Sequence, residues 1–94
     1  MRQLDFTKSA ERSLRKLAES DIRIAKQLKI KILALLHEPH PQDSLKMAGN
    51  PEYLRVRVGK YRIIYRYDND KLYIALIAKR EIVYEEFARL MSRQ

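Results

Sequence analysis

Apolar residues stand at helical spacing in the first half of the chain. The first such group is Ala10, Leu14, Leu17 and Ala18. Its spacing predicts a helix over about residues 8–18, with Thr7 as the N-cap and a short strand over residues 2–6 before it. The second and longer group is Ile24, Ala25, Leu28, Ile32, Leu35 and Leu36. It predicts a second helix that Ser20 caps and that stops before Pro39, because proline cannot continue a helix.

The pattern changes to that of strands after a loop expected over residues 38–52. Alternation predicts a hairpin over about residues 53–67, with Gly59 and Lys60 in its turn. A turn is expected over residues 68–70, and residues 72–77 are apolar enough for a strand that is covered on both faces. From Glu81 the spacing is helical again. The apolar positions of this last segment are Tyr84, Phe87, Leu90 and Met91.

The predicted elements follow one another as strand, helix, helix, three strands and helix. This order, β-α-α-β-β-β-α, predicts an α+β fold with a mainly antiparallel sheet. We expect the sheet to pack against an N-terminal helical hairpin and a C-terminal helix, with the helices on one face. A chain of 94 residues holds a single domain, residues 1–94, without room for a separate cofactor domain.

The predicted hairpin gathers arginines on one face. A two-residue turn with glycine first suits a type II′ hairpin, which places Arg57 opposite Arg62. Because side chains alternate along a strand and paired residues share a face, this register sorts the side chains. One face holds Arg55, Arg57, Arg62 and Arg66, and the other holds Leu54, Val56, Val58, Tyr61, Ile63 and Tyr65. Like charges opposed across strands are destabilising, so a polyanionic ligand is the expected reason for the arginine face.

The composition agrees with an anionic ligand. There are 20 Lys and Arg against 12 Asp and Glu, which gives a formal charge of +8. Each half of the chain contributes the same excess of basic residues, so the charge belongs to the folded body and not to a tail. Cysteine is absent, and no long apolar run or signal-peptide pattern is seen. We therefore expect a soluble cytoplasmic protein without disulfides or membrane association.

Two histidines stand in the proline-rich connector. His37 and His40 flank Glu38. A zinc site needs further ligands at suitable spacing, and this segment does not offer them. We interpret both histidines as loop residues and expect no metal site.

A long motif resembles a known family of toxins. It begins Lys46-Met47-Ala48-Gly49-Asn50-Pro51-Glu52-Tyr53, continues through the hairpin to Tyr65, and is completed by Lys79-Arg80-Glu81-Ile82-Val83-Tyr84. This pattern is similar to the RelE branch of the RelE/ParE toxin superfamily, and the order of elements agrees along the whole chain. Members of that branch belong to type II toxin–antitoxin pairs and cleave messenger RNA in the ribosomal A site. The resemblance implies a RelE-like fold and a metal-independent endoribonuclease, or mRNA interferase, without a cofactor.

The resemblance also implies roles for single residues. Arg62 matches a phosphate-binding arginine, Arg80 an arginine that acts on the scissile phosphate or the leaving group, and Tyr84 a tyrosine that stacks on or orients a base. Arg55 and Arg57 stand where well-studied members carry lysines. The expected catalytic residues are Arg57, Arg62, Arg80 and Tyr84, and the expected substrate-binding residues are Lys46, Arg55, Lys60, Arg66 and Lys79. Strict alternation from Lys79 would turn Arg80 away from the arginine face, so a twist, bulge or chain exit must redirect it.

Three of the tyrosines also have structural interpretations. Tyr61 and Tyr65 share the apolar face of the hairpin, so we expect them to be packing residues. Tyr84 opens the last helix, and its alternative role is that of the helix's first core contact. The sequence leaves both roles of Tyr84 open.

Arginine alone does not supply all the chemistry of RNA cleavage. The 2′-hydroxyl must be activated, the charge of the phosphorane stabilised and the 5′-oxygen protonated. Arginine suits the second task, but its pKa above about 12 keeps it protonated and unfit as a base. Candidate bases are Lys60, Lys79, Glu81 and the two loop histidines, among which the sequence does not choose.

The resemblance further implies the partners of the protein. A cognate acidic antitoxin is expected to wrap the basic surface in a hetero-oligomer and to cover or displace the last helix, while the ribosome and A-site messenger RNA are the targets. One alternative is a ParE-like toxin that inhibits DNA gyrase by binding, without nuclease activity. Another is a catalytically degenerate toxin homologue that acts only in a repressor complex. The matches at Arg80 and Tyr84 favour the nuclease.

Overall fold

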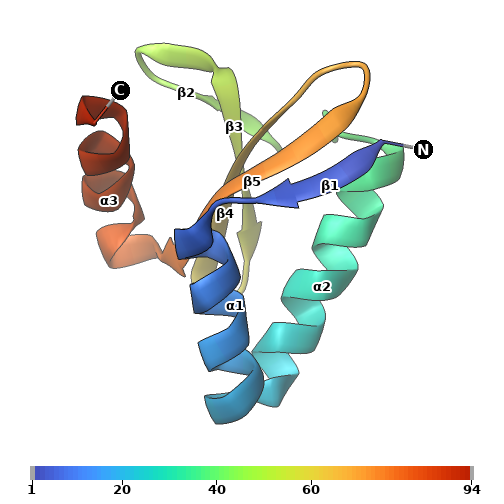
Figure 1. Ribbon diagram of the computed structural model, residues 1–94, viewed down its shortest axis with the longest axis vertical. Helices are drawn as coiled ribbons and strands as arrows, with labels where there is room; N and C mark the ends of the chain where they lie inside the picture. Colours follow the sequence, from blue (N-terminus) through green and yellow to red (C-terminus); the bar gives the residue numbers. More distant parts are fainter. Residues whose placement is uncertain (1, 94) are drawn as a thin grey trace.

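Five strands form one sheet in the order β1-β5-β4-β3-β2, in a computed structural model that describes residues 2–93. The elements are β1 (Gln3–Phe6), α1 (Lys8–Ser20), α2 (Ile22–His37), β2 (Leu45–Met47), β3 (Asn50–Val58), β4 (Tyr61–Tyr67), β5 (Lys71–Lys79) and α3 (Arg80–Ser92) (Figure 1). Strand β1 pairs with β5 in parallel, and the other pairs are antiparallel. The predicted α+β fold with a mainly antiparallel sheet is confirmed.

The two N-terminal helices begin at polar caps. The Thr7 hydroxyl accepts a hydrogen bond from the Ala10 backbone N–H at the start of α1, as predicted. The predicted cap of α2 is wrong, because α1 continues through Ser20 and Asp21 caps α2 instead. The Asp21 carboxylate accepts from the Ile24 N–H at 3.3 Å. The helices therefore follow each other with one residue between them.

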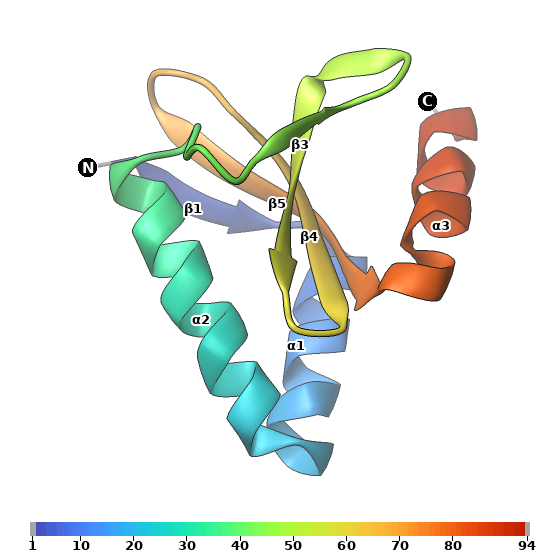
Figure 2. The same cartoon turned by 180° about the vertical axis from the view of Figure 1, so that it is seen from behind.

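The helices cover both faces of the sheet. On one face, α1 and α2 close a core that includes Leu28, Leu35, Val56 and Ile63. Helix α3 lies on the opposite face (Figures 1 and 2), where Val83 and Phe87 are buried. Their partners in this second core include Met47, Tyr53, Ile64, Leu76 and Ala78. The expectation of all helices on one face is wrong, since this second face is also apolar and needs a cover.

The segment expected as a loop over residues 38–52 contains β2 and the start of β3. Leu45 and Lys46 pair with Arg55 and Leu54, and the chain reverses through Gly49, whose φ is +80°. Strand β2 has only three residues, too few for an alternating pattern to predict it. The structure therefore has one strand more than expected, at the edge of the sheet.

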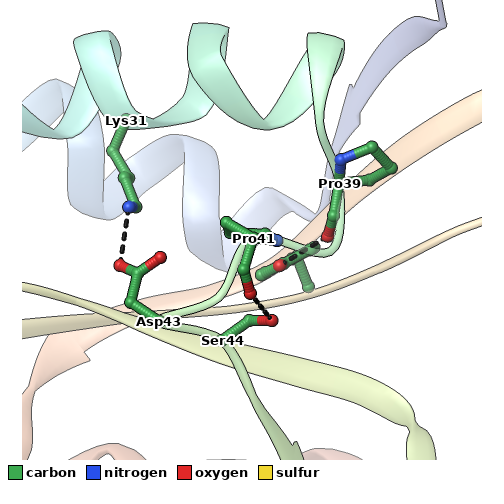
Figure 3. A network of polar contacts seen from close by, with 6 residues as sticks. Lys31, Pro39, Pro41, Asp43 and Ser44 are labelled. Carbon is green, nitrogen blue, oxygen red and sulfur yellow. Dashed lines mark hydrogen bonds and ion pairs between the residues drawn. The ribbon is translucent and has the colours of Figure 1, made fainter.

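Two polar contacts tie the connector between α2 and β2 to the rest of the domain, and a third lies within the connector (Figure 3). The Lys31 ammonium donates to the Asp43 carboxylate at 2.7 Å, and the Ser44 hydroxyl donates to the Pro41 carbonyl at 2.6 Å. The hydroxyl of the buried Tyr65 donates to the Pro39 carbonyl at 2.7 Å, and burial raises the pKa of Tyr65. These contacts fix the point from which β2 starts. None of the helices in the described part of the chain is long and apolar enough to span a membrane.

Candidate functional site

The β3–β4 hairpin has the predicted register. Val58 pairs with Tyr61, and Arg57 lies directly opposite Arg62. Gly59 has a φ of +59°, while no other residue type among residues 2–93 has a positive φ. A positive φ at the first turn position alone is what a type II′ turn requires. The two arginines therefore face each other across the strands, close to the turn.

Arg62 lies at the centre of a group of cations. Its guanidinium donates to the Gly59 and Tyr61 carbonyls at 3.2 and 3.0 Å. The pKa of Arg62 is lowered by desolvation and then by three neighbouring positive charges, whereas the Glu81 carboxylate opposes the shift. These neighbours are Arg57, Arg80 and Arg55. We call Arg55, Arg57, Arg62 and Arg80 the arginine cluster.

A β-bulge brings Arg80 into this cluster. Ile64 pairs with Leu76 and Tyr65 with Ile74, so Ala75 stands unpaired between them. Such an extra residue reverses the faces of the strand beyond it. Before the bulge, Leu72 and Ile74 pack in the core under α1 and α2, whereas Leu76 and Ala78 beyond it pack in the core under α3.

The reversed face continues into α3. Ala78 pairs with Arg62, so Arg80, two residues further, follows on the arginine face. The Arg80 backbone N–H donates to the Lys60 carbonyl at 2.9 Å, which ties the start of α3 to the hairpin turn. The expected redirection of Arg80 is thus supplied by a bulge.

The structure does not bring all expected site residues together. Lys79 pairs with Tyr61 and lines a groove beside Lys16 of α1, on the face away from the cluster. Arg66 lies four residues beyond Arg62 on β4, about 13 Å along the strand, and its guanidinium stands 4.0 Å from the Tyr73 ring centroid. Lys60 is exposed at the tip of the hairpin. Arg66 and Lys79 are therefore separate from the arginine cluster.

Tyr84 faces solvent beside the cluster. It is 41% exposed, and the Arg55 guanidinium lies over its ring, 5.2 Å from the centroid. Val83 and Phe87 make the core contacts of α3, so the interpretation of Tyr84 as a core residue is wrong. The Phe87 ring meets Tyr53 edge to face, with 5.2 Å between the ring centroids.

An open pocket of about 460 Å³ adjoins Tyr84. Its apolar lining consists of Met47, Ala48, Phe87, Ala88 and Met91, and its polar lining of Lys46, Asn50, Arg55 and Tyr84. Sequence reasoning expected Lys46, Arg55 and Tyr84 at the site but did not single out Asn50. The only available sign was that Asn50 stands inside the motif that carries the family resemblance.

The arrangement suits a phosphate-bearing ligand. Guanidinium groups bind phosphate oxygens with two parallel hydrogen bonds, and several together stabilise developing negative charge. No group of three or more His, Cys, Asp or Glu within residues 2–93 is placed to hold a metal ion. Glu81, in the first turn of α3, is the carboxylate whose charge acts on Arg62. The interpretation of His37 as a loop residue is wrong, because His37 is the last residue of α2, which packs on the other face of the sheet.

Comparison with known proteins gives the family and the fold. The family model of the ParE toxin of type II toxin–antitoxin system, parDE, matches residues 4–84. A search of curated proteins finds no match.

Solved structures of toxins are similar to the chain. A YoeB/ParE toxin from Agrobacterium tumefaciens is 17% identical, with a TM-score of 0.74 over 83% of this chain and 98% of that one. The toxin–antitoxin complex RelBE2 from Mycobacterium tuberculosis has a chain 25% identical, with a TM-score of 0.68 over 84% and 98%. A chain of the intact E. coli RelBE complex is 24% identical, with a TM-score of 0.70 over 84% and 96%.

These findings agree with the superfamily that the sequence motif indicated. The TM-scores show that the solved structures share the fold of this chain. The family match extends from Leu4 in β1 to Tyr84, so it includes residues of all five strands and the whole arginine cluster. The chain belongs to the ParE toxin family of type II toxin–antitoxin systems, within the RelE/ParE superfamily.

Proposed function

We propose that this toxin is a ribosome-dependent endoribonuclease, which cleaves messenger RNA in the ribosomal A site and so inhibits translation. The observation that carries the proposal is the arginine cluster beside the exposed Tyr84. The charges of three arginines, two from β3 and one from the start of α3, act there on Arg62 of β4, next to an open pocket. A polyanion with bases attached fits both parts of this surface.

The arginines take the electrostatic part of the reaction. Arg62 and Arg57 pair directly across the hairpin, and in this proposal they hold the scissile phosphate between them. Arg80 stands at the start of α3, where no side chain caps the helix, so the helix dipole adds to the positive potential. Its guanidinium is suited to the charge that develops on the leaving 5′-oxygen.

Glu81 is the proposed base for the 2′-hydroxyl. Among the candidates it is the one whose charge reaches Arg62. Lys79 lies on the opposite face of the sheet, and His37 ends the helix that packs there. A carboxylate is a modest base at neutral pH, so positioning of the substrate by the ribosome supplies much of the acceleration in this proposal.

The proposed partner is an acidic antitoxin. Two of the similar solved structures are complexes of a toxin with its antitoxin. The net charge of +8 suits an acidic partner. A partner that displaces α3 must also cover the apolar face of the sheet on which α3 packs, so it must be amphipathic. In this proposal the antitoxin covers the arginine cluster and covers or displaces α3. Charge reversal at Arg55 and Arg57 should then weaken association, and more so at low salt.

Primer extension on a defined messenger in purified programmed ribosomes tests the nuclease. The wild-type protein should cut the A-site codon and leave naked RNA intact. Arg62→Ala and Arg80→Ala should each lower cleavage at least about 100-fold, by loss of transition-state stabilisation. The matched control is Lys79→Ala, which removes the adjacent cation on the other face and should leave cleavage within a few-fold. Equal loss at positions 79 and 80 in folded variants would reject the site.

The alternative of gyrase inhibition is favoured by one observation, the match to the ParE family model. In that case the basic sheet binds a protein target and performs no chemistry. Intact messenger in active ribosomes, together with loss of gyrase supercoiling activity, would support this function. If the messenger stays intact and gyrase stays active, the catalytically degenerate homologue is the remaining explanation.

A further inference from the structure

We propose that the open pocket beside Tyr84 binds one base of the RNA and that Asn50 reads this base as adenine. The inference rests on the proposed nuclease function for the source of the base. It adds a recognition site and a specificity residue to the phosphate-binding cluster.

The pocket has the size and lining that a base needs. Its volume of about 460 Å³ exceeds that of one purine, and it opens to solvent. Met47 and Phe87 form a buried apolar part of the lining. The side chain of Ala88 is small, so it leaves space for a ligand on its side of the pocket. An aromatic ring such as that of Tyr84 is a surface on which a base can stack. The pocket therefore favours a flat and largely apolar ligand.

The positive charges around the pocket favour a base that is part of a nucleic acid. Arg55 belongs to both parts of the surface, because its guanidinium covers the Tyr84 ring and its charge acts on Arg62. Lys46 adds a second cation at the pocket. A base in the pocket is thus part of an RNA chain whose neighbouring phosphate lies on the arginine cluster. A peptide with an acidic side chain would satisfy the cations but would not use the aromatic wall.

Asn50 supplies the recognition chemistry. It is the first residue of β3 and pairs with Met47 across the tight β2–β3 turn, so its backbone is held in place. Its carboxamide offers one donor and one acceptor. Adenine presents the complementary pair, an acceptor at N7 and a donor at N6. The lining thus combines non-specific stacking with one group that distinguishes bases.

The first experiment measures base preference in programmed ribosomes. Messengers carry each of the four bases in turn at each position of the A-site codon, and the cleavage rates are compared. At one position the wild-type protein should prefer adenine over pyrimidines by about tenfold. Asn50→Leu, which keeps the size and removes the carboxamide, should bring the four bases within about twofold while cleavage continues. Wild-type cleavage without a preference, or an unchanged preference in Asn50→Leu, would overturn the reading by Asn50.

A second experiment separates the pocket from the nuclease function. A short RNA with 2-aminopurine and a non-cleavable 2′-deoxy linkage loses fluorescence when its base stacks. The wild-type protein should quench it, and Ala88→Phe, which fills the pocket, should not. Ala18→Phe is the matched control, because Ala18 is also an exposed alanine, on α1, and lines a different groove. Quenching without ribosomal cleavage would keep the base pocket and reject the nuclease, whereas no quenching by the wild-type protein would reject the pocket.

Discussion

Replacing Arg57 by glutamine should stabilise the fold. Arg57 lies directly opposite Arg62 on the antiparallel pair β3–β4, and its charge lowers the pKa of Arg62. Like charges opposed in this way destabilise a sheet. Glutamine retains a long polar side chain and removes the charge. The variant Arg57→Gln should therefore be more stable than the wild-type protein and less active.

The size of the effect follows from the charges. Two unit charges about 6 Å apart in a water-like dielectric repel by about 0.7 kcal/mol. This agrees with the range of about 0.2–1 kcal/mol for cross-strand pairs. At 1 M salt the Debye length falls to about 3 Å, which leaves roughly 0.1 kcal/mol. The low-salt value corresponds to a rise of about 3–5 °C in the melting temperature of a domain of this size.

Urea unfolding at 10 mM and at 1 M salt measures both quantities. The control Arg15→Gln removes the same charge from α1, where Arg15 forms an ion pair with Glu11 at 3.0 Å. It should leave stability unchanged or lower it by up to about 0.5 kcal/mol. A decrease in stability for Arg57→Gln at low salt, or a gain that persists unchanged at 1 M salt, would refute the idea that this pair costs stability.

Three further changes test other parts of the structure. Phe87→Ala should cost about 3–5 kcal/mol of unfolding free energy, since this 5%-exposed ring packs against Tyr53, and hydrogen exchange should show α3 deprotected first. The hydrogen bond from Lys31 lowers the pKa of Asp43 from its ordinary 3.8, so its stabilisation is present above pH 3.8 and is lost as pH falls through the folded pKa. In Asp43→Asn the free energy of unfolding should thus fall less than in the wild-type protein when the pH is lowered from 5 to 2. Thr7→Val should cost about 1–2 kcal/mol by thermal unfolding and Thr7→Ser little, because the hydroxyl caps α1.

The hairpin was predictable because its determinants are local. Alternation along β3 and β4 and the glycine at position 59 fix both the register and the arginine face. The caps show the limit of such reasoning. Ser20 and Asp21 are adjacent and both are good N-caps, so the point where α1 ends decides between them. A cap residue alone does not indicate where the preceding helix ends.

The pocket could not be predicted, because it is made by elements distant in sequence. Strand β2 gains its place from pairing with β3 and from the contacts that tie its connector to α2 and β4. The position of α3 depends on an apolar face to which four strands contribute, β2, β3, β4 and β5, with residues that include Ile64 and Leu76. Periodicity within one segment reports which residues of that segment share a face. It does not report which face of the sheet a later helix will cover.

The bulge at Ala75 links the fold to the site. Without it, strict alternation along β5 would leave Ala78 and Arg80 on the face of Leu72 and would turn Lys79 towards Arg62. Because of the extra residue, Arg80 and not Lys79 lies in the arginine cluster. The Thr7 hydroxyl donates to the Ala75 carbonyl at 2.6 Å and so satisfies a backbone group that the ladder leaves free. Thr7 thus both caps α1 and stabilises the bulge in β5 that puts Arg80 beside Arg62. The N-terminal segment therefore supports a site that lies at the far end of β5.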